Sequence, residues 1–396
     1  MKKIGRFILN IITIFLVIIL VVLGFRVFNV FMASPRGDGS VYKDEMVDIN
    51  GIPQYLLTRG ENQDNPVVLV LHGGPATPTS AISYYYQHDL EDEYTFVNWD
   101  QRGSGRTYYA SPIAGQDVTT EHLLADIDVI VERLQNEYNE DKIIILSHSW
   151  GSILGNLYTQ DYPEKVNRHI AVGQYINSQD DKVAADFASE LAMKSGDEES
   201  VAAINQAVEK LQSEPMSLEN LSALREQTDK YLPNGESMNV FQQFWLALTS
   251  PDVGIDDVKY YYTLITQPDE ILQEQTGLID TMSTFDAYNS MRFEVPYYFI
   301  SGDEDWVTPY TLVEDYAAEI TAPDVDFVEI PQSGHLPFID QNYKVFNYEL
   351  RELLGREVEE VEVVGEGEES AEVEESEQNL SDYPDSIFTD MFRKSE

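Results

Sequence analysis

Short apolar runs alternate with amphipathic stretches along most of the chain. Six of the runs are rich in Val, Ile, Leu, Phe and Tyr and have the length of strands that are covered on both faces. They are Pro66–His72, Tyr94–Asp100, Lys142–His148, Asn167–Gln174, Val295–Gly302 and Val325–Pro331. Between two of them, Thr120–Tyr138 repeats apolar residues at a helical spacing. Strands and helices in alternation predict right-handed crossovers and an α/β fold, with a mainly parallel sheet and helices on both faces.

Two segments depart from this alternation. Glu45–Asn50 and Gln54–Thr58 flank Gly51-Ile-Pro53, and this pattern predicts an antiparallel hairpin at the edge of the sheet. From about Ser178 to Glu294 the chain is rich in Ala, Glu, Gln and Leu and is interrupted by prolines. That composition predicts a helical cap inserted into the α/β core.

The N-terminus carries the longest apolar run. Phe7–Phe25 contains few polar residues and is about long enough to cross a bilayer core at about 1.5 Å per residue. The basic residues within positions 1–6 favour a cytoplasmic N-terminus. We therefore predict an uncleaved single-pass anchor in the cell membrane, with the rest of the chain extracytoplasmic. A cleaved signal peptide is the alternative, although Phe31-Met-Ala-Ser34 is a poor cleavage site.

Acidic residues dominate the other end of the chain. Glu357 to Asp390 contains many Glu and Asp, no Lys or Arg and few large apolar residues. Such a segment cannot bury enough surface to offset its ordering entropy, so we predict a disordered tail. The whole chain of 396 residues has a net charge of −45, which disfavours a nucleic-acid partner. It contains no cysteine, which excludes disulfides and a thiolate nucleophile.

A buried strand runs directly into small polar residues at Ile143-Ile-Ile-Leu-Ser-His-Ser-Trp-Gly151. Ser147-x-Ser149-x-Gly151 between a strand and a helix matches the nucleophile elbow, a strained turn that exposes the middle serine. The residues two before and two after that serine must be small, because the strand and helix backbones nearly touch there. Ser149 is therefore the candidate nucleophile, and an ordinary strand-to-helix turn with a serine cap is the alternative.

A serine hydroxyl needs a base that is oriented by an acid. Of the six histidines, His335 lies just after the last predicted strand, in Ser333-Gly-His-Leu-Pro337, where the chain order Ser, acid, His places the base. His148 lies inside the elbow, and its side chain is expected to point away from that of Ser149. The acid should follow the preceding strand, where the spacing from Gly302 and Pro309 favours Asp305 over Asp303.

Charge that develops on the substrate oxygen needs hydrogen-bond donors already in place. The backbone amide of Trp150, the residue after the candidate nucleophile, is one expected donor. The other should come from Leu71-His-Gly-Gly-Pro-Ala76, where we select Gly74, with Gly73 as the near alternative. No His/acid pair at ligand spacing supports a metal, so we expect neither a metal nor a cofactor.

Taken together, these motifs resemble the α/β-hydrolase fold, and within it the prolyl iminopeptidase group of serine hydrolases. The segments that carry the resemblance are His72-Gly-Gly-Pro75, Trp99-Asp-Gln-Arg-Gly-Ser-Gly105, Ser147-His-Ser-Trp-Gly-Ser152, the turn from Gly302 to Pro309 and Ser333-Gly-His335. The resemblance implies that Ser149, Asp305 and His335 form a catalytic triad and that Gly74 and Trp150 form the oxyanion hole. It also implies that Asp100–Gly105 supports the site structurally.

The chain departs from the family pattern at some positions. Ala76 stands where a second glycine is usual after the loop proline, and Ser147 stands where glycine is commoner. Family members that cleave peptides hold the substrate's amino terminus with cap carboxylates, and this sequence does not identify them. Acids such as Glu190, Asp197 and Glu198 fit a solvated helix face equally well. Two tyrosine runs, Tyr84–Tyr86 and Tyr260–Tyr262, suit either an apolar pocket or ordinary packing.

The resemblance implies a serine hydrolase that acts through an acyl-enzyme, with an aminopeptidase that releases N-terminal proline or small residues from peptides as the leading hypothesis. An esterase or lipase acting on acyl esters is the enzymatic alternative, and a surface binding module without activity is the other. Epoxide hydrolase chemistry is disfavoured, because those elbows carry an aspartate where Ser149 stands. The expected substrate is a small peptide or ester, and the oligomeric state is unknown from sequence.

The expected organisation has seven parts. They are a cytoplasmic N-terminus at 1–6, a transmembrane anchor at 7–25, a linker at 26–40, a first core segment at 41–177, a helical cap at 178–294, a second core segment at 295–355 and an acidic tail at 356–396.

Overall fold

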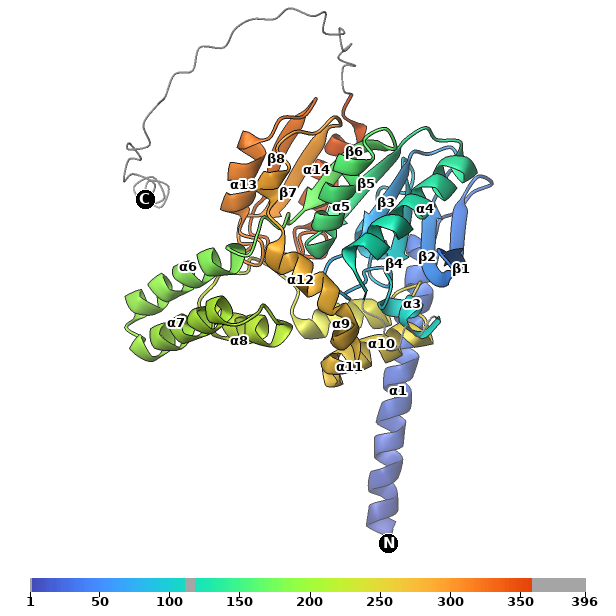
Figure 1. The fold of residues 1–396 in the computed structure, drawn as a ribbon. Coiled ribbons are helices and arrows are strands. Elements are labelled where there is room, and N and C mark those ends of the chain that lie inside the picture. The colour runs from blue at the N-terminus through green and yellow to red at the C-terminus, as the bar shows by residue number, and fades with distance from the viewer. Residues whose placement is uncertain (1, 111–117, 358–396) are drawn as a thin grey trace, which may run out of the picture. The chain divides into compact units, whose positions relative to one another are not determined.

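The computed structural model describes residues 2–110 and 118–357. Within these residues, eight strands form one sheet in the order β1-β2-β4-β3-β5-β6-β7-β8 (Figure 1). The strands are β1 (Val41–Ile49), β2 (Ile52–Gly60), β3 (Val67–Leu71), β4 (Thr95–Asp100), β5 (Ile143–His148), β6 (Val166–Val172), β7 (Tyr297–Gly302) and β8 (Val325–Ile330). The β1–β2 and β2–β4 pairs are antiparallel, and each of the other neighbouring pairs is parallel. The predicted mainly parallel sheet is confirmed.

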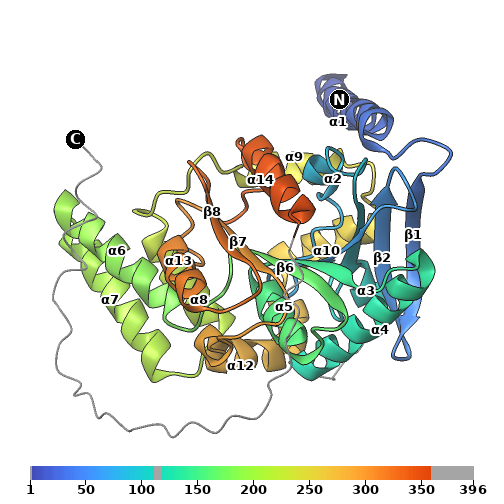
Figure 2. The ribbon, with the colours of Figure 1, turned by 90° about the horizontal axis from the view of Figure 1, so that it is seen from above.

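Helices cover both faces of the sheet, which explains why its central strands are mostly apolar. On one face, α4 (Thr120–Tyr138) and α5 (Trp150–Asp161) pack against residues of β3, β4 and β5. On the other face, α2 (Tyr84–Gln87) and α14 (Tyr343–Gly355) pack against the alternate side chains of the same strands (Figure 2). Two further helices are α3 (Gly105–Ala110) and α13 (Tyr310–Glu319), the latter packed on β7. α4 has the bounds that the apolar spacing predicts.

The hairpin at the sheet edge has a tighter turn than the sequence suggested. The turn consists of Asn50 and Gly51 alone, with φ of 52° and 78°, so Ile52 and Pro53 belong to β2. Positive φ at both central residues gives a turn whose twist matches that of the strands. Pro53 is tolerated in β2 because pairing with β4 begins only at Tyr55.

The segment between β6 and β7 is helical. Its helices are α6 (Asp180–Ser195), α7 (Glu198–Ser213), α8 (Leu218–Thr228), α9 (Val240–Leu248), α10 (Ile255–Thr266), α11 (Pro268–Leu272) and α12 (Thr276–Thr284). The first three pack around a small core of their own, formed by Ala185, Ala188, Ile204 and Leu224. All seven follow the carboxyl end of β6 and lie at that end of the sheet (Figure 1). The bounds 178–294 for a separate cap stay a prediction.

The apolar N-terminal segment forms one continuous helix, α1 (Lys2–Ala33). It runs past the predicted end at Phe25, so residues 26–33 of the expected linker are helical. Val27–Met32 are apolar apart from Asn29 and compatible with a helix, and Pro35 disfavours helical geometry at the residue before it. Residues 6–33 are long and apolar enough to cross a membrane, a property that a signal sequence shares. The prediction of a disordered acidic tail falls almost wholly on residues 358–396, outside the described residues.

Candidate active site

Ser149 lies at the turn between β5 and α5 with φ 52° and ψ −124°. A side chain in this conformation costs about 1–3 kcal/mol and persists only where the surroundings fix it. The Ser149 backbone amide donates to the Val172 carbonyl oxygen at 3.0 Å. A Cβ on Gly151 would lie 2.3 Å from the Leu71 carbonyl oxygen, so no larger residue fits there without movement. The turn therefore has the close strand-to-helix approach that the spacing of small residues predicts.

His335 and Asp305 lie together at the carboxyl ends of β8 and β7. His335 Nδ1 is 2.8 Å from Asp305 Oδ2. The buried carboxylate also accepts hydrogen bonds from the backbone amides of Val307 at 2.9 Å and Thr308 at 3.0 Å. Burial alone would raise the pKa of Asp305, but the neighbouring His335 and these hydrogen bonds hold it below its usual value. Asp305 is therefore ionised where an imidazole partner needs a negative charge.

Asp303, the alternative acid, has a different partner. Its Oδ1 accepts a hydrogen bond from the Ser333 backbone amide at 3.1 Å. Asp340 adds to the same loop, accepting from the Ser333 hydroxyl at 2.6 Å and from the Gly334 amide at 3.0 Å. The carboxylates of Asp303 and Asp340 thus hold the loop that carries His335. Of these two acids and Asp305, only Asp305 contacts the imidazole.

Gly173 is a site residue that the sequence analysis did not identify. It follows β6 with φ of +57°, and a Cβ there would lie 3.2 Å from both Asp305 Oδ2 and His335 Cε1. Asp305 and His335 therefore lie against the Gly173 backbone, where a side chain would crowd them. Gly173 lies inside the predicted run Asn167–Gln174, and nothing in the local sequence indicates which loops meet above it.

Both candidate oxyanion segments lie beside Ser149. Gly73 faces the elbow, since a Cβ on it would lie 3.0 Å from Ser149 Cβ. Gly73, Gly74 and Ser149 line one cavity, so both glycines stay candidates for the second donor. Trp150 is the first residue of α5, where its amide has no acceptor within the helix.

Gln101 joins these two segments. Its Nε2 donates to the His72 carbonyl oxygen at 3.0 Å, and its Oε1 accepts from Trp150 Nε1 at 3.3 Å. The loop Asp100–Gly105 thus connects the His72 backbone to the Trp150 indole through the Gln101 side chain. The sequence predicted a supporting role for this loop but did not identify Gln101 as the connecting residue.

His148 contacts the candidate base directly. Its Nε2 donates to the His335 carbonyl oxygen at 2.9 Å, and the two rings are 4.8 Å apart. Burial, followed by the nearby His335, lowers the pKa of His148 to about 3, so its imidazole is neutral near pH 7. His148 and Ser149 line the same cavity, and the expectation that the His148 side chain points away from that of Ser149 stays a prediction. His148 supports the His335 loop and is itself a poor base.

The cavity that contains Ser149, called the main cavity below, has a volume of about 1060 Å³. This is at the upper end of the range of ligand pockets. Besides Ser149, His148 and His335, its walls are mostly apolar. The apolar wall residues are Pro78, Ile82, Met238, Phe241, Phe244, Ala247, Leu248, Val253, Val258, Tyr261, Tyr262, Ile265, Val307 and Leu336, and the other polar wall residues are Thr77, Thr79, Arg225, Asn234, Ser237, Gln243 and Thr266. Most of the apolar wall residues belong to α9 and α10. Of the two tyrosine runs, Tyr84 and Tyr260 are buried in packing, and Tyr261 and Tyr262 line the cavity.

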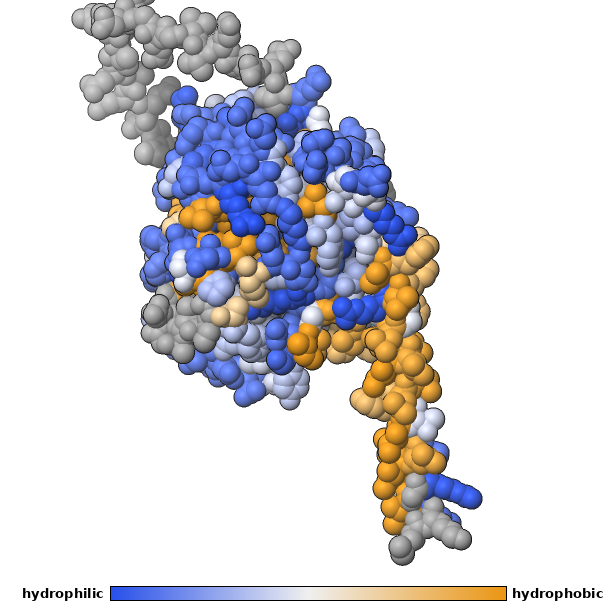
Figure 3. Space-filling view, turned by 90° about the vertical axis from the view of Figure 1, so that its right-hand side faces the viewer, coloured by the Kyte–Doolittle hydropathy of each residue, from blue (hydrophilic) through white to orange (hydrophobic). Residues whose placement is uncertain are grey.

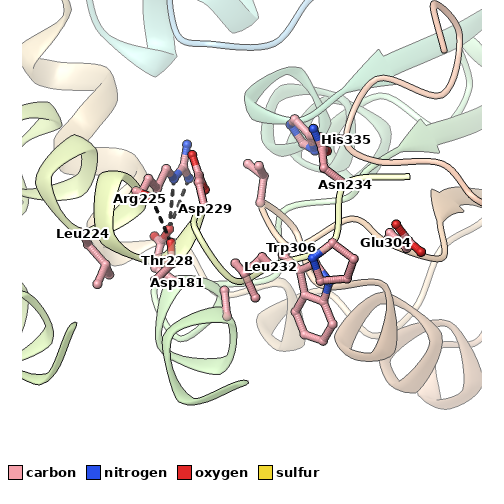
Figure 4. Close-up of a pocket in the computed structure, with 13 residues that line it drawn as sticks. Asp181, Leu224, Arg225, Thr228, Asp229, Leu232, Asn234, Glu304, Trp306 and His335 are labelled. Atoms are coloured by element: carbon pink, nitrogen blue, oxygen red, sulfur yellow. Dashed lines mark hydrogen bonds and ion pairs between the residues drawn. The ribbon is translucent and has the colours of Figure 1, made fainter. Parts of the chain in front are cut away.

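A second, smaller cavity of about 200 Å³, the polar recess (Figure 4), shares Arg225 and His335 among its lining residues with the main cavity. Carboxylates of Asp181, Asp229 and Glu304 line it, together with Arg225 and Trp306. Arg225 pairs with Asp181 at 3.2 Å. Burial raises the pKa of Asp229, and Arg225 lowers it by a smaller amount. The recess therefore brings three acids and one base close to the candidate triad.

The acids of the recess were not found from the sequence, because nothing in their spacing distinguishes them from surface acids. The acids that the sequence analysis considered lie elsewhere. Glu190 pairs with Lys194 at 2.7 Å on α6, and Asp197 caps α7 by accepting from the Ser200 amide at 3.0 Å. Across residues 2–110 and 118–357, no group of three or more His, Asp or Glu side chains is arranged to hold a metal ion.

Comparison with known proteins identifies the family of this arrangement. Residues 66–341 match the family model described as the alpha/beta hydrolase fold. The chain is 27% identical over 301 residues to the "Probable aminopeptidase YbaC" of Bacillus subtilis, covering 74% of this chain and 91% of that protein. It is 34% identical over 137 residues to the "Probable proline iminopeptidase" of Streptomyces coelicolor, covering 33% of this chain and 40% of that protein.

Solved structures agree on the fold. A proline iminopeptidase-related protein from Thermus thermophilus superposes with a TM-score of 0.55 at 21% identity, over 79% of this chain and 97% of that one. The likeness to the prolyl iminopeptidase group inferred from the motifs is thus confirmed at the level of family and fold.

Proposed function

Because the chain belongs to the alpha/beta hydrolase fold family, we propose that it is a serine hydrolase with Ser149 as its nucleophile. His335 accepts the Ser149 Oγ proton while Oγ attacks a carbonyl carbon, and Asp305 stabilises the imidazolium that forms. Amides of Trp150 and Gly74 stabilise the negative oxygen. His335 then protonates the leaving group, and water releases the acyl group from Ser149. The contact of His335 with Asp305 at 2.8 Å supports these roles.

The proposed activity is that of an aminopeptidase. The observation that carries it is the polar recess, which is lined by Asp181, Asp229 and Glu304 together with His335. A peptide bound with its scissile carbonyl at Ser149 has its α-ammonium within a short distance of that carbonyl, so a nearby recess lined by carboxylates suits a free amino terminus. The names of the Bacillus and Streptomyces relatives point to the same class of reaction. Release of N-terminal proline or a small residue fits the modest volume of the recess, about 200 Å³.

Esterase activity is the second candidate, and the main cavity favours it. Its mostly apolar walls would accept a neutral acyl chain without any ammonium group. The two candidates differ in one requirement, the free amino group.

The test compares the arylamide of proline with its N-acetylated form. Charge-assisted hydrogen bonds contribute about 1.5–3 kcal/mol each, so acetylation should lower kcat/KM at least about tenfold in an aminopeptidase. Short and long acyl esters are assayed alongside. Equal hydrolysis of the free and acetylated arylamides, or turnover of acyl esters alone, would contradict the aminopeptidase proposal and favour the esterase.

Ser149→Ala is the control for the nucleophile. The variant should fold, lose turnover of every substrate and lose covalent labelling by a fluorophosphonate. Labelling that persists at the site in Ser149→Ala would contradict the assignment of Ser149. A wild-type chain that neither reacts with the fluorophosphonate nor turns over any substrate would favour a binding module without activity.

A further inference from the structure

The main cavity is much larger than the group that an aminopeptidase releases. Its volume is about 1060 Å³, whereas the polar recess of about 200 Å³ already suits the amino-acid part of a substrate. The main cavity is enclosed mostly by apolar side chains of α9 and α10, with Gln243 and Thr266 as the polar lining residues on these helices. A polar peptide would lose more hydration there than these few polar groups replace. The shape and chemistry of the cavity fit a long apolar chain.

The apolar walls of the main cavity reach the surface of the protein. Phe241 of α9 is 74% exposed and Ile265 of α10 is 70% exposed, and both also line the cavity. Phe244, Val258 and Tyr262 combine exposure and cavity lining in the same way. The entrance is therefore surrounded by large apolar side chains, an arrangement that in water marks a contact with an apolar partner.

The same helices are attached to α1. The ring of Phe25 packs edge-on against Trp245 of α9 at 5.4 Å. Arg26 donates to the Val253 carbonyl oxygen at 2.7 Å, and Asn29 donates to the Thr249 carbonyl oxygen at 2.9 Å. The link between α9 and α10 is thus held against α1 at the end of the apolar run Phe7–Phe25. Apolar surface runs along α1 up to its junction with the domain (Figure 3).

If α1 crosses a bilayer, these contacts fix the position of the cavity entrance relative to the membrane surface. α1 has 32 residues and is about 48 Å long, whereas the hydrocarbon layer is about 30 Å thick. Arg26 and Asn29 are the first polar residues after the apolar run, so they belong at the membrane surface. Trp245, which packs against Phe25, then lies at that level, where aromatic side chains are favoured, and Phe241 and Phe244 are exposed on the same helix.

We propose that the main cavity opens onto the membrane and that the substrate is an aminoacyl ester or amide of a long-chain amphiphile, a proposal that rests on the function proposed above. The amino-acid part lies at the polar recess and the apolar chain extends through the main cavity towards the bilayer. Ser149 Oγ forms a bond to the aminoacyl carbon, and the bond from that carbon to the chain's oxygen or nitrogen breaks. His335 delivers the Ser149 proton to that atom, and water then releases the free amino acid.

Chain length tests the substrate class. The full-length protein in phosphatidylcholine vesicles is given alanyl esters and alanyl amides of propyl and dodecyl chains. Each buried methylene contributes up to about fourfold, so the dodecyl compounds should exceed the propyl compounds at least about a hundredfold in kcat/KM. The ester and amide series distinguish the two linkages. Equal rates for both lengths would overturn the inference, and faster hydrolysis of hexadecanoyl methyl ester than of any alanyl compound would overturn the aminoacyl part.

Variants separate cavity binding from partition of the substrate into the vesicles. Ile265→Asp and Phe241→Asp place a charge at the entrance on exposed positions that should tolerate it, and each should lower the dodecyl to propyl ratio at least about tenfold. Tyr348→Asp on α14 is the matched control, because Tyr348 is also an exposed apolar residue but does not line the cavity, and its ratio should stay that of the wild type. An unchanged ratio in both entrance variants would overturn the inference. Failure to hydrolyse any aminoacyl compound would instead overturn the proposed function.

Whether the cavity entrance faces the bilayer can be measured separately with single cysteine labels, because the chain contains no native cysteine. A fluorophore is attached to Phe241→Cys, Ile265→Cys or Tyr348→Cys in the full-length protein in vesicles that contain spin-labelled lipid. The lipid should quench the first two fluorophores and leave the third unquenched. Equal quenching at all three positions, or none at Phe241 and Ile265, would show that the entrance does not face the bilayer.

Discussion

At the scale of single residues, the two acids after β7 illustrate how close neighbours acquire different tasks. Asp305 and Asp303 are two positions apart, yet one contacts the His335 imidazole and the other the Ser333 amide. Asp305→Asn should lower kcat by several orders of magnitude, since an amide neither orients the imidazole correctly nor stabilises its charge. Asp303→Asn keeps an oxygen that can accept from Ser333, so its effect on kcat should be mild. Steady-state kinetics of both variants check this, and the reverse ranking would move the acid to Asp303.

His169 gives a residue-scale prediction about pH. Burial lowers its pKa from 6.5 to about 3, and its Nε2 lies 2.7 Å from the Ser147 hydroxyl. The unfolded chain therefore binds a proton there that the folded chain does not. The stability that depends on His169 staying neutral is fully present above pH 6.5. It is lost as the pH falls from 6.5 towards 3, because protons bind the unfolded chain first.

The His169→Asn variant removes this difference of about one bound proton between the unfolded and folded states. Between about pH 6 and pH 4, its unfolding free energy should therefore rise less steeply with pH than that of the wild type, by about 1.4 kcal/mol per pH unit. Denaturant unfolding at several pH values measures it. His122→Asn on the exposed side of α4 controls for the loss of an imidazole. Identical slopes in the wild type and His169→Asn would show that burial does not suppress protonation of His169.

At the scale of elements, the junction of β5 and α5 depends on backbone contact. A Cβ on Gly151 would lie 2.3 Å from the Leu71 carbonyl oxygen and 2.7 Å from that of His72, both of them backbone atoms that cannot rotate away. Gly151→Ala should therefore separate α5 from β3 and lower the free energy of unfolding by about 1–3 kcal/mol or more. Thermal and denaturant unfolding measure the loss. Ser149→Ala in the same turn should cost little by comparison, because Ser149 already carries a Cβ, and equal losses in the two variants would contradict this explanation.

At the scale of the whole molecule, α1 determines where the activity would be located. The basic residues before the apolar run favour retention of the N-terminus in the cytoplasm. Protease added to intact cells should then remove the α/β domain, while a fragment containing α1 stays with the membrane. Immunoblots against each end measure this, with a cytoplasmic protein as the control for intact cells. Protection of the domain until lysis would reverse the orientation, and recovery of the domain in the medium without protease would favour a cleaved signal sequence.

The sequence by itself determined what depends on neighbours along the chain. The run Ile143–Leu146 requires a buried strand whatever surrounds it, and Ser147, Ser149 and Gly151 have the spacing that a tight strand-to-helix turn demands. Likewise, the apolar spacing of Thr120–Tyr138 gives the bounds of α4. The order of the candidate residues along the chain follows from the same local patterns, as does the apolar helix at the N-terminus, although its end at Ala33 does not.

Only the tertiary structure decided what depends on residues far apart in the chain. The spacing from Gly302 and Pro309 favoured Asp305 over Asp303, but the different partners of the two acids follow from the position of the His335 loop. Gly173 matters because two loops from other strands close over it. Asp181, Asp229 and Glu304 form a recess because α6, α8 and the β7 loop meet, and α9 faces α1 through contacts such as that of Phe25 with Trp245. The physical reason is that a helix or strand is set by hydrogen bonds and side-chain periodicity within a few residues, whereas a cavity is set by how whole elements pack.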